Sequence, residues 1–170
     1  MAVNIILTGM PASGKSTVGV VLAKLMGLDY IDTDILIQKN HGKRLEQIIS
    51  EQGLEAFLQI EEAECYSLDA TNAVIATGGS VIYSEAAMRH LREIGTVVYL
   101  KVDVPELVRR IGDMKQRGVA LKPGQTLEDL YRERVPLYER WADLTIEGKS
   151  IEDTAETIKM MITSEKKNTA

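Results

Sequence analysis

The chain has 170 residues, of which 45% are hydrophobic, and a formal net charge of −5 at pH 7. This length and hydrophobic content suffice for one hydrophobic core without a stabilising metal. Cys65 is the only cysteine, so an internal disulfide is excluded and a cytoplasmic location is expected. The acidic balance argues against nucleic acid as a partner, and no apolar run approaches the roughly 18 residues of a membrane span.

A phosphate-binding loop stands near the N-terminus. Gly9–Thr17 matches the pattern GxxxxGK[ST] at every fixed position, between a strand expected at Val3–Thr8 and a helix expected at Lys15–Met26. Glycines let the backbone N–H groups turn toward phosphate oxygens, and the helix start adds the positive end of its dipole. The sequence therefore predicts ATP binding, with Mg²⁺ on the Ser16 hydroxyl, by Gly9, Ala12, Ser13, Gly14, Lys15, Ser16 and Thr17.

Strands and helices alternate along the rest of the chain. Further strands are expected at Asp29–Ile31, Val74–Thr77, Thr96–Leu100 and Leu144–Ile146. Further helices are expected at Asp34–Asn40, Leu45–Ser50, Gly53–Thr71, Glu85–Ile94, Pro105–Asp113, Leu127–Trp141 and Ile151–Ile162. This alternation predicts an α/β protein: a single-domain P-loop kinase fold whose five-stranded parallel sheet is flanked by helices.

Two segments fall outside this alternation. The polar stretch at about 114–125 contains Gly118, Pro123 and Gly124 and predicts a mobile lid over the site. The domain is expected to occupy residues 1–163, and residues 164–170 are expected to form a flexible tail.

Two carboxylates, Asp32 and Asp34, stand at the end of the second expected strand. Ligands of open α/β sheets bind at the carboxyl ends of strands, so both side chains face the expected site. One carboxylate can hold the water shell of Mg²⁺ and the other can orient or deprotonate an acceptor hydroxyl. For an isolated pair, a helix cap and a first-turn acid would explain them as well; the nearby phosphate loop favours function.

Together with Thr77–Ser80, Gly95–Leu100 and Arg134–Asp143, these motifs resemble the shikimate kinase family in order and spacing. The similarity runs from about Val3 to Ile162. It implies a monomeric enzyme that uses MgATP to phosphorylate the 3-hydroxyl of shikimate, a small hydroxylated acceptor, in aromatic amino acid biosynthesis.

The resemblance also implies a role for each site residue. Lys15, Asp34 and the lid residue Arg117 are the catalytic residues, and Ser16 and Asp32 hold the metal. Arg110 packs on adenine, a part that the neighbouring Arg109 could also take. An arginine, Arg134, would hold the carboxylate of the acceptor, and the glycines would contact the acceptor through their backbone. The residues implied at the acceptor are Asp34, Leu58, Gly78, Gly79, Ser80 and Arg134.

The acceptor site departs from the family pattern at two positions. The family's Phe-Arg-x-x-Glu reads Phe57–Glu61 here, with Leu58 in place of the arginine that helps to hold the shikimate carboxylate. Leucine offers neither a charge nor a bidentate fork, and Glu61 loses a cationic partner. Ser80 replaces the third glycine of a GGG run and narrows the floor of the pocket.

Three interpretations of the function follow. The protein phosphorylates shikimate, with the missing charge supplied by Lys43, Arg44 or Lys122. Alternatively, the same chemistry serves another polyol, sugar acid or amino-alcohol. The third interpretation is an ATP-binding regulatory protein without catalysis, against which the complete set of phosphate and metal ligands argues.

Overall fold

The computed structural model describes residues 3–111 and 119–168. Its centre is a five-stranded sheet in the order β2-β3-β1-β4-β5, in which every neighbouring pair is parallel. The strands are β1 (Ile5–Thr8), β2 (Asp29–Asp32), β3 (Ala73–Ala76), β4 (Thr96–Lys101) and β5 (Leu144–Glu147). The predicted α/β fold with five parallel strands is confirmed.

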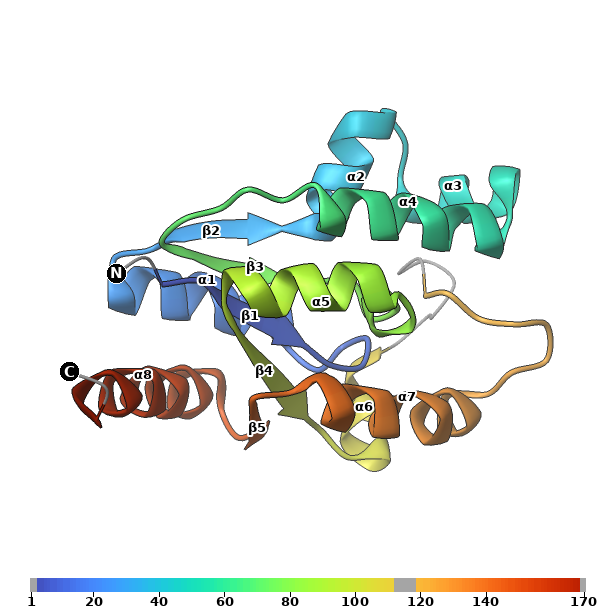
Figure 1. Cartoon of the computed structure of the whole chain (residues 1–170). Coiled ribbons are helices and arrows are strands. Elements are labelled where there is room, and N and C mark those ends of the chain that lie inside the picture. The colour runs from blue at the N-terminus through green and yellow to red at the C-terminus, as the bar shows by residue number, and fades with distance from the viewer. Residues whose placement is uncertain (1–2, 112–118, 169–170) are drawn as a thin grey trace.

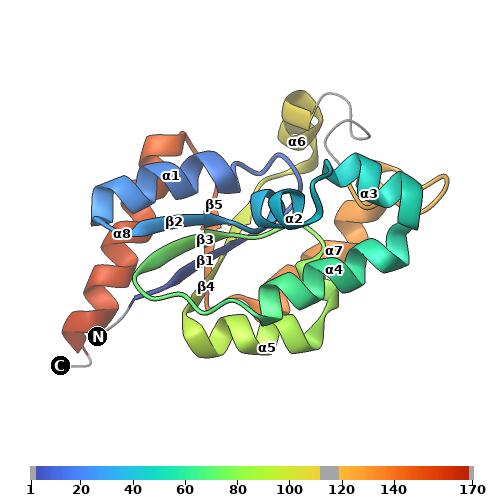
Figure 2. The same ribbon diagram turned by 90° about the horizontal axis from the view of Figure 1, so that it is seen from above.

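Helices cover both faces of this sheet. They are α1 (Lys15–Met26), α2 (Thr33–His41), α3 (Leu45–Gln52), α4 (Leu54–Tyr66), the 3-10 helix η1 (Val81–Tyr83), α5 (Glu85–Ile94), α6 (Val104–Ile111), α7 (Leu127–Trp141) and α8 (Ile151–Asn168). Figure 2 shows α1 and α8 on one face and α5 on the other.

The central strand β1 shows why the sequence forms a doubly covered sheet. Its residues Ile5, Ile6 and Leu7 are fully buried. Ile5 and Leu7 join the apolar cluster that includes α1 and α8, whereas Ile6 joins the cluster that includes α5 and α7. Successive side chains of a strand point to opposite faces, so a strand buried on both sides is apolar throughout.

Three segments differ from the sequence-based expectation. The helix expected to reach Thr71 ends at Tyr66, and Asn72 has a φ of 57°, which an α-helix excludes. The expected tail is helical as far as Asn168, because α8 continues beyond Ile162. Residues 114–118 of the expected lid lie outside the described residues, and 119–125 have no helix or strand.

The topology places three connections at one end of the sheet. β1 leads into the phosphate loop, β2 ends at Asp32, and β3 leads into Thr77 and Gly78. The two chain termini lie at the opposite end of the sheet (Figure 1). The carboxyl ends of β1, β2 and β3, where these connections meet, are therefore the expected place for a ligand.

In the described part of the chain, none of the helices has the length and apolar character that a membrane crossing requires.

Candidate active site

A cavity of about 760 Å³ opens at this end of the sheet. Its walls come from the phosphate loop, the connection after β3, α4, α7 and the start of α8. The sequence-predicted residues that line it are Ala12, Gly14, Lys15, Ser16, Thr17, Asp34, Gly78, Gly79, Ser80, Arg110 and Arg134. The fold thus brings the predicted nucleotide and acceptor residues into one cavity.

Some predicted residues do not line this cavity. Gly9 and Ser13 belong to the phosphate loop but face the protein interior, and a Cβ on Gly9 would come within 2.8 Å of both the Leu100 carbonyl oxygen and Ser13 Oγ. This crowding explains why the loop has glycine at position 9. Asp32 contacts the cavity residue Ser16, and Arg117 lies outside the described residues.

The phosphate loop has the backbone of an anion site. Ala12 and Gly14 have φ angles of 63° and 96°, and α1 begins directly after Gly14 with no side chain bonded to its first N–H groups. These N–H groups have no intrahelical partner and are available to phosphate oxygens. The Lys15 ammonium donates to the carbonyls of Gly9 and Met10 at 2.8 and 2.9 Å, and burial lowers the pKa of Lys15 to about 8.

Of the two neighbouring arginines, Arg110 faces this loop. Its Nη1 lies 3.9 Å from the position that a Cβ on Gly14 would occupy, and the residue lines the cavity. Both arginines pair with Glu106, but the Arg109 side chain is 75% exposed and that of Arg110 only 30%. Of the two, Arg110 is therefore the one placed to contact a ligand at this loop, and its packing on adenine stays a prediction.

The two oxygens of the Asp32 carboxylate have different partners. Its Oδ1 accepts from the backbone N–H groups of Asp34 and Ile35 and so caps α2. Its Oδ2 accepts from Ser16 Oγ at 2.8 Å and from the Tyr30 hydroxyl at 3.0 Å. The cap orients the carboxylate, and its second oxygen lies beside the Ser16 hydroxyl.

This hydroxyl–carboxylate pair fits Mg²⁺. Within the described residues, no group of three or more His, Cys, Asp and Glu side chains could hold a metal. Mg²⁺ typically takes one or two protein oxygens and completes its octahedron with phosphate oxygens and water. Ser16 and Asp32 beside the phosphate loop provide that kind of partial site.

Two glycines form the floor of the acceptor region. A Cβ on Gly78 would lie 2.0 Å from Glu61 Oε1 and 2.9 Å from Asp34 Oδ1, and one on Gly79 would lie 2.9 Å from Arg134 Nη1. Three charged side chains therefore converge where only glycine fits.

We expected the acceptor to contact the backbone of these glycines, but part of that backbone is already hydrogen-bonded within the protein. The Gly78 N–H donates to Thr33 Oγ1 at 3.1 Å, and the Gly79 carbonyl accepts from the Tyr138 hydroxyl at 2.5 Å. These two bonds hold the floor in place. Tyr138 is fully buried, and nothing in the local sequence of α7 indicates its contact with Gly79.

Arg134 is buried to 1% exposure, although it lies in a helix rich in charged residues. Its Nε donates to the Tyr83 hydroxyl at 3.2 Å and its Nη2 to the Ala120 carbonyl at 3.0 Å. Both acceptors are neutral, and no ion pair to a carboxylate within the described residues balances its charge. A buried guanidinium that faces a cavity in this way is suited to a carboxylate ligand.

The half-buried Asp34 and the buried Glu61 each have one carboxyl oxygen that is shielded from solvent. Asp34 Oδ1 and Glu61 Oε1 have no hydrogen-bond partner. Burial, with the Asp32 charge adding to it, raises the pKa of Asp34 to about 6. Burial raises the pKa of Glu61 to about 7, against the opposing effect of the Ser80 hydroxyl, which donates to Oε2. Sequence reasoning singled out Glu61 only through its missing partner.

Leu58 does not line the cavity, which corrects its assignment as an acceptor contact. It packs beside the cluster that includes Ile37 and Phe57, and it lines a smaller hollow to which Glu61 and Ser80 also contribute. Phe57 and Glu61, on either side of it in the chain, line the main cavity. An arginine at position 58 would be one turn of α4 from Glu61, close enough to pair with its carboxylate.

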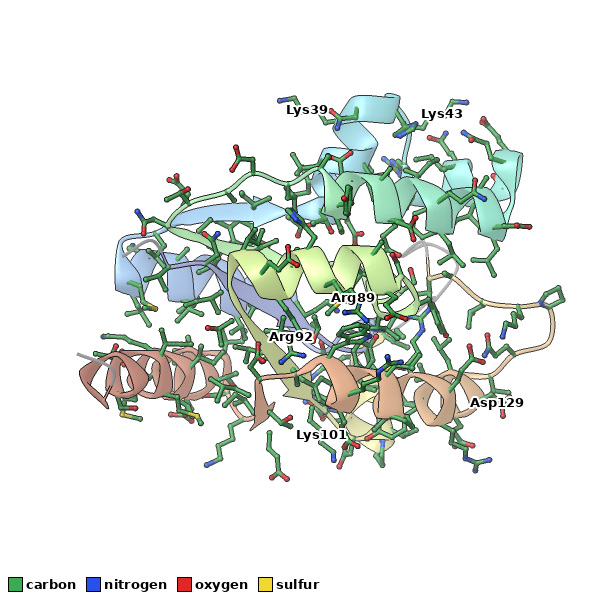
Figure 3. The ribbon with its side chains drawn as sticks, in the orientation of Figure 1. Lys39, Lys43, Arg89, Arg92, Lys101 and Asp129 are labelled. Carbon is green, nitrogen blue, oxygen red and sulfur yellow. The ribbon has the colours of Figure 1, made fainter. Side chains whose placement is uncertain are left out.

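The cations considered as replacements for the missing arginine are engaged elsewhere. Lys43 pairs with Glu51, and Figure 3 shows Lys43 at the outer edge of α2 and α3. Lys122 lies 3.3 Å from Glu133, and neither lysine lines the cavity. Arg44 likewise faces Glu46 and is largely exposed. The missing charge is not restored by these three residues.

The buried Glu61 carboxylate predicts a pH-dependent stability. Its pKa of about 7 in the folded chain exceeds the ordinary 4.5, so the folded state binds the proton more tightly than the unfolded state. The free energy of unfolding therefore falls as the pH rises from about 4.5 to about 7. Glu61→Gln removes this loss and should raise the free energy of unfolding at about pH 8 by about 1 to 3 kcal/mol.

Urea denaturation of wild type and Glu61→Gln at about pH 5 and about pH 8 checks this. The exposed neighbour Glu62 provides the matched control, and Glu62→Gln should leave the pH dependence unchanged. A Glu61→Gln protein destabilised equally at both pH values would contradict the raised pKa.

Comparison with known proteins gives one consistent result. The family model described as shikimate kinase matches residues 11–163. A shikimate kinase from Caldanaerobacter subterraneus is 36% identical over 160 residues, covering 91% of this chain and 93% of the relative. One from Chlorobium chlorochromatii is 38% identical over 167 residues, covering 91% and 87%.

Solved structures agree. The shikimate kinase from Acinetobacter baumannii in complex with shikimate superposes with a TM-score of 0.90 at 33% identity, covering 98% of this chain and 96% of the other. The shikimate kinase from Aquifex aeolicus gives a TM-score of 0.82 at 28% identity, covering 95% and 97%.

Proposed function

This chain belongs to the shikimate kinase family, and we propose that it transfers the γ-phosphoryl group of ATP to the 3-hydroxyl of shikimate. One observation carries the proposal. The buried Arg134 guanidinium, which has only neutral partners, faces the same cavity as the phosphate loop and Asp34. A carboxylate-bearing acceptor held by Arg134 is thereby placed between a proton acceptor and the triphosphate site.

Different residues of the site bind the triphosphate and accept the proton in the proposed in-line transfer. The N–H groups of the phosphate loop and the Lys15 ammonium hold the triphosphate and neutralise charge that builds up in the transition state. Asp34, with a free oxygen in the cavity, orients the acceptor hydroxyl and takes its proton. The assignment of Arg117 to the transferring group stays a prediction.

Mg²⁺ is the proposed metal cofactor, with Ser16 as a ligand and Asp32 holding its water. When bound, the ion would neutralise charge on the outer phosphates. The Ser16–Asp32 hydrogen bond supports this assignment, because it places a hydroxyl and an oriented carboxylate beside the phosphate loop. We also propose a monomeric, cytoplasmic enzyme, since one chain contributes all the named site residues and ATP is a cytoplasmic substrate.

A coupled assay of ADP release tests the proposed function. With MgATP, shikimate should raise the rate of ADP formation well above the rate without acceptor. Arg134→Met keeps much of the side-chain volume and removes the charge, so the KM for shikimate should rise about 10- to 100-fold. Arg132, exposed on the same helix, supplies the control Arg132→Met. A lack of ADP release with shikimate would overturn the assignment of the acceptor.

Leu58→Arg should improve the use of shikimate. An arginine at position 58 can pair with Glu61 and cancel its repulsion of an anionic acceptor. We expect the KM for shikimate to fall about tenfold, with the KM for ATP unchanged. Gln59→Arg places the same charge on the exposed side of α4 and should have no such effect. An unchanged KM in Leu58→Arg would show that Glu61 does not oppose shikimate binding.

A further inference from the structure

The acceptor region contains a buried carboxyl group, that of Glu61, which the proposed reaction does not use. Glu61 is 1% exposed and lines the main cavity. Ser80 donates to its Oε2 at 2.5 Å, but its Oε1 has no partner and points at the floor formed by Gly78. A buried polar atom without a partner carries a free-energy cost that a ligand can remove.

No cation of this chain, within the described residues, pairs directly with Glu61. The nearest positive charges that influence it are Arg134 and Lys15, and neither forms an ion pair with it. Leu58, at the position from which an arginine could reach Glu61, is apolar and lines a smaller hollow together with Glu61, so it offers no charge to the carboxylate. Among the described residues no cation is paired with this carboxylate, so a ligand that carries one would complement it.

The cavity floor then presents three complementary groups. Arg134 provides a cation beside Gly79, and Glu61 provides an anion beside Gly78. Asp34 Oδ1, also without a partner, lies at the same glycine as Glu61. A ligand with a carboxylate, an ammonium group and a hydroxyl would pair with all three groups.

We propose that this cavity takes α-amino acids that carry a side-chain hydroxyl and phosphorylates that hydroxyl. Arg134 holds the carboxylate, Glu61 holds the ammonium group, and Asp34 receives the hydroxyl. The inference rests on the proposed function, because it uses the same phosphate loop and the same proton acceptor, and it names a class of acceptor beyond shikimate.

The reaction balances as an ordinary phosphoryl transfer. The bond between the γ-phosphorus of ATP and the oxygen that bridges to the β-phosphate breaks, and its electron pair leaves with ADP. The side-chain hydroxyl oxygen forms the new bond to phosphorus, and its proton passes to Asp34. The ammonium group stays protonated on Glu61 and takes no part in the bond changes.

ADP release with paired acceptors tests the proposal. L-serine, L-threonine and L-homoserine are compared with 3-hydroxypropanoate, 3-hydroxybutanoate and 4-hydroxybutanoate, which lack the amino group, and with shikimate. At least one hydroxy amino acid should be a substrate, with a kcat/KM about 10- to 100-fold above that of its deaminated counterpart. Product mass must show the O-phosphorylated amino acid.

Two variants should move the acceptor preference in defined directions. Glu61→Gln keeps the shape and the Ser80 contact, and should lower kcat/KM for the amino acid about tenfold or more without lowering that for shikimate. Leu58→Arg should supply Glu61 with an internal cation and produce the same selective loss. Glu62→Gln and Gln59→Arg, on the exposed side of the same helix, should change neither.

The possible failures are distinguishable. Turnover of shikimate with no hydroxy amino acid used would overturn this inference and leave the proposed function standing. ADP release stimulated by KCl with shikimate, and lost in Glu61→Gln, would assign the carboxylate to an inorganic cation and also overturn it. An absence of ADP release with every acceptor would overturn the proposed function itself.

Discussion

Lys15→Ala should lower kcat/KM for ATP-dependent transfer by at least about 100- to 1,000-fold, the range seen when one preorganised donor to a transition-state oxyanion is removed. The ammonium group is buried against the phosphate loop and donates to the carbonyls of Gly9 and Met10. Its pKa of about 8 keeps it mostly protonated at neutral pH. Alanine removes the charge that would meet the outer phosphates.

The control is Lys24→Ala, which removes an exposed lysine from the same helix. Kinetics of ADP release should be unchanged in this variant, and thermal melting of both variants should show a cooperative transition. A folded Lys15→Ala enzyme with near-normal kcat/KM would exclude the phosphate-binding role of this lysine.

Asp34→Asn should lower kcat by about 10²- to 10⁴-fold, because the amide cannot accept the hydroxyl proton. The KM for ATP should change little, since Asp34 lies on the acceptor side, at Gly78. The substitution keeps the side-chain volume and removes a half-buried carboxylate whose pKa is already raised to about 6. The fold should therefore tolerate the substitution.

Steady-state kinetics with varied acceptor separate the two parameters. Asp29→Asn, at the exposed start of β2, the strand that leads into α2, is the control and should behave as wild type. Near-normal kcat in Asp34→Asn would remove Asp34 from the proton-transfer step and leave positioning as the only basis of catalysis.

Local sequence predicted the parts of the site that depend on neighbours in the chain. The phosphate loop and its flanking strand and helix occupy consecutive residues, so pattern and spacing located them. The same holds for Asp32, whose capping of α2 is a contact between residues two and three apart. The predicted end of α4 at Thr71 was wrong, because helix-forming residues continue past Tyr66 whereas the chain turns back there to reach β3.

The acceptor region depends on contacts between distant segments, and sequence reasoning reached it only in part. The family resemblance pointed to Arg134, but the charged helix around it does not predict its burial, which contacts with Tyr83 and Ala120 produce. Leu58 was expected in the pocket, but the rotation of α4 turns Phe57 and Glu61 inward instead. Which side of a helix faces a cavity is decided by packing against other elements, and a short segment does not specify it.

Transfer of label from ATP to shikimate would demonstrate the proposed reaction itself. Wild-type protein is incubated with shikimate and with ATP that carries radioactive phosphorus in its γ-phosphate, and the products are separated by ion exchange. We expect label in an acid-stable phosphate ester of shikimate, in equal amount to the ADP formed. Label that stays in ATP, or appears only as inorganic phosphate, would contradict the proposed reaction.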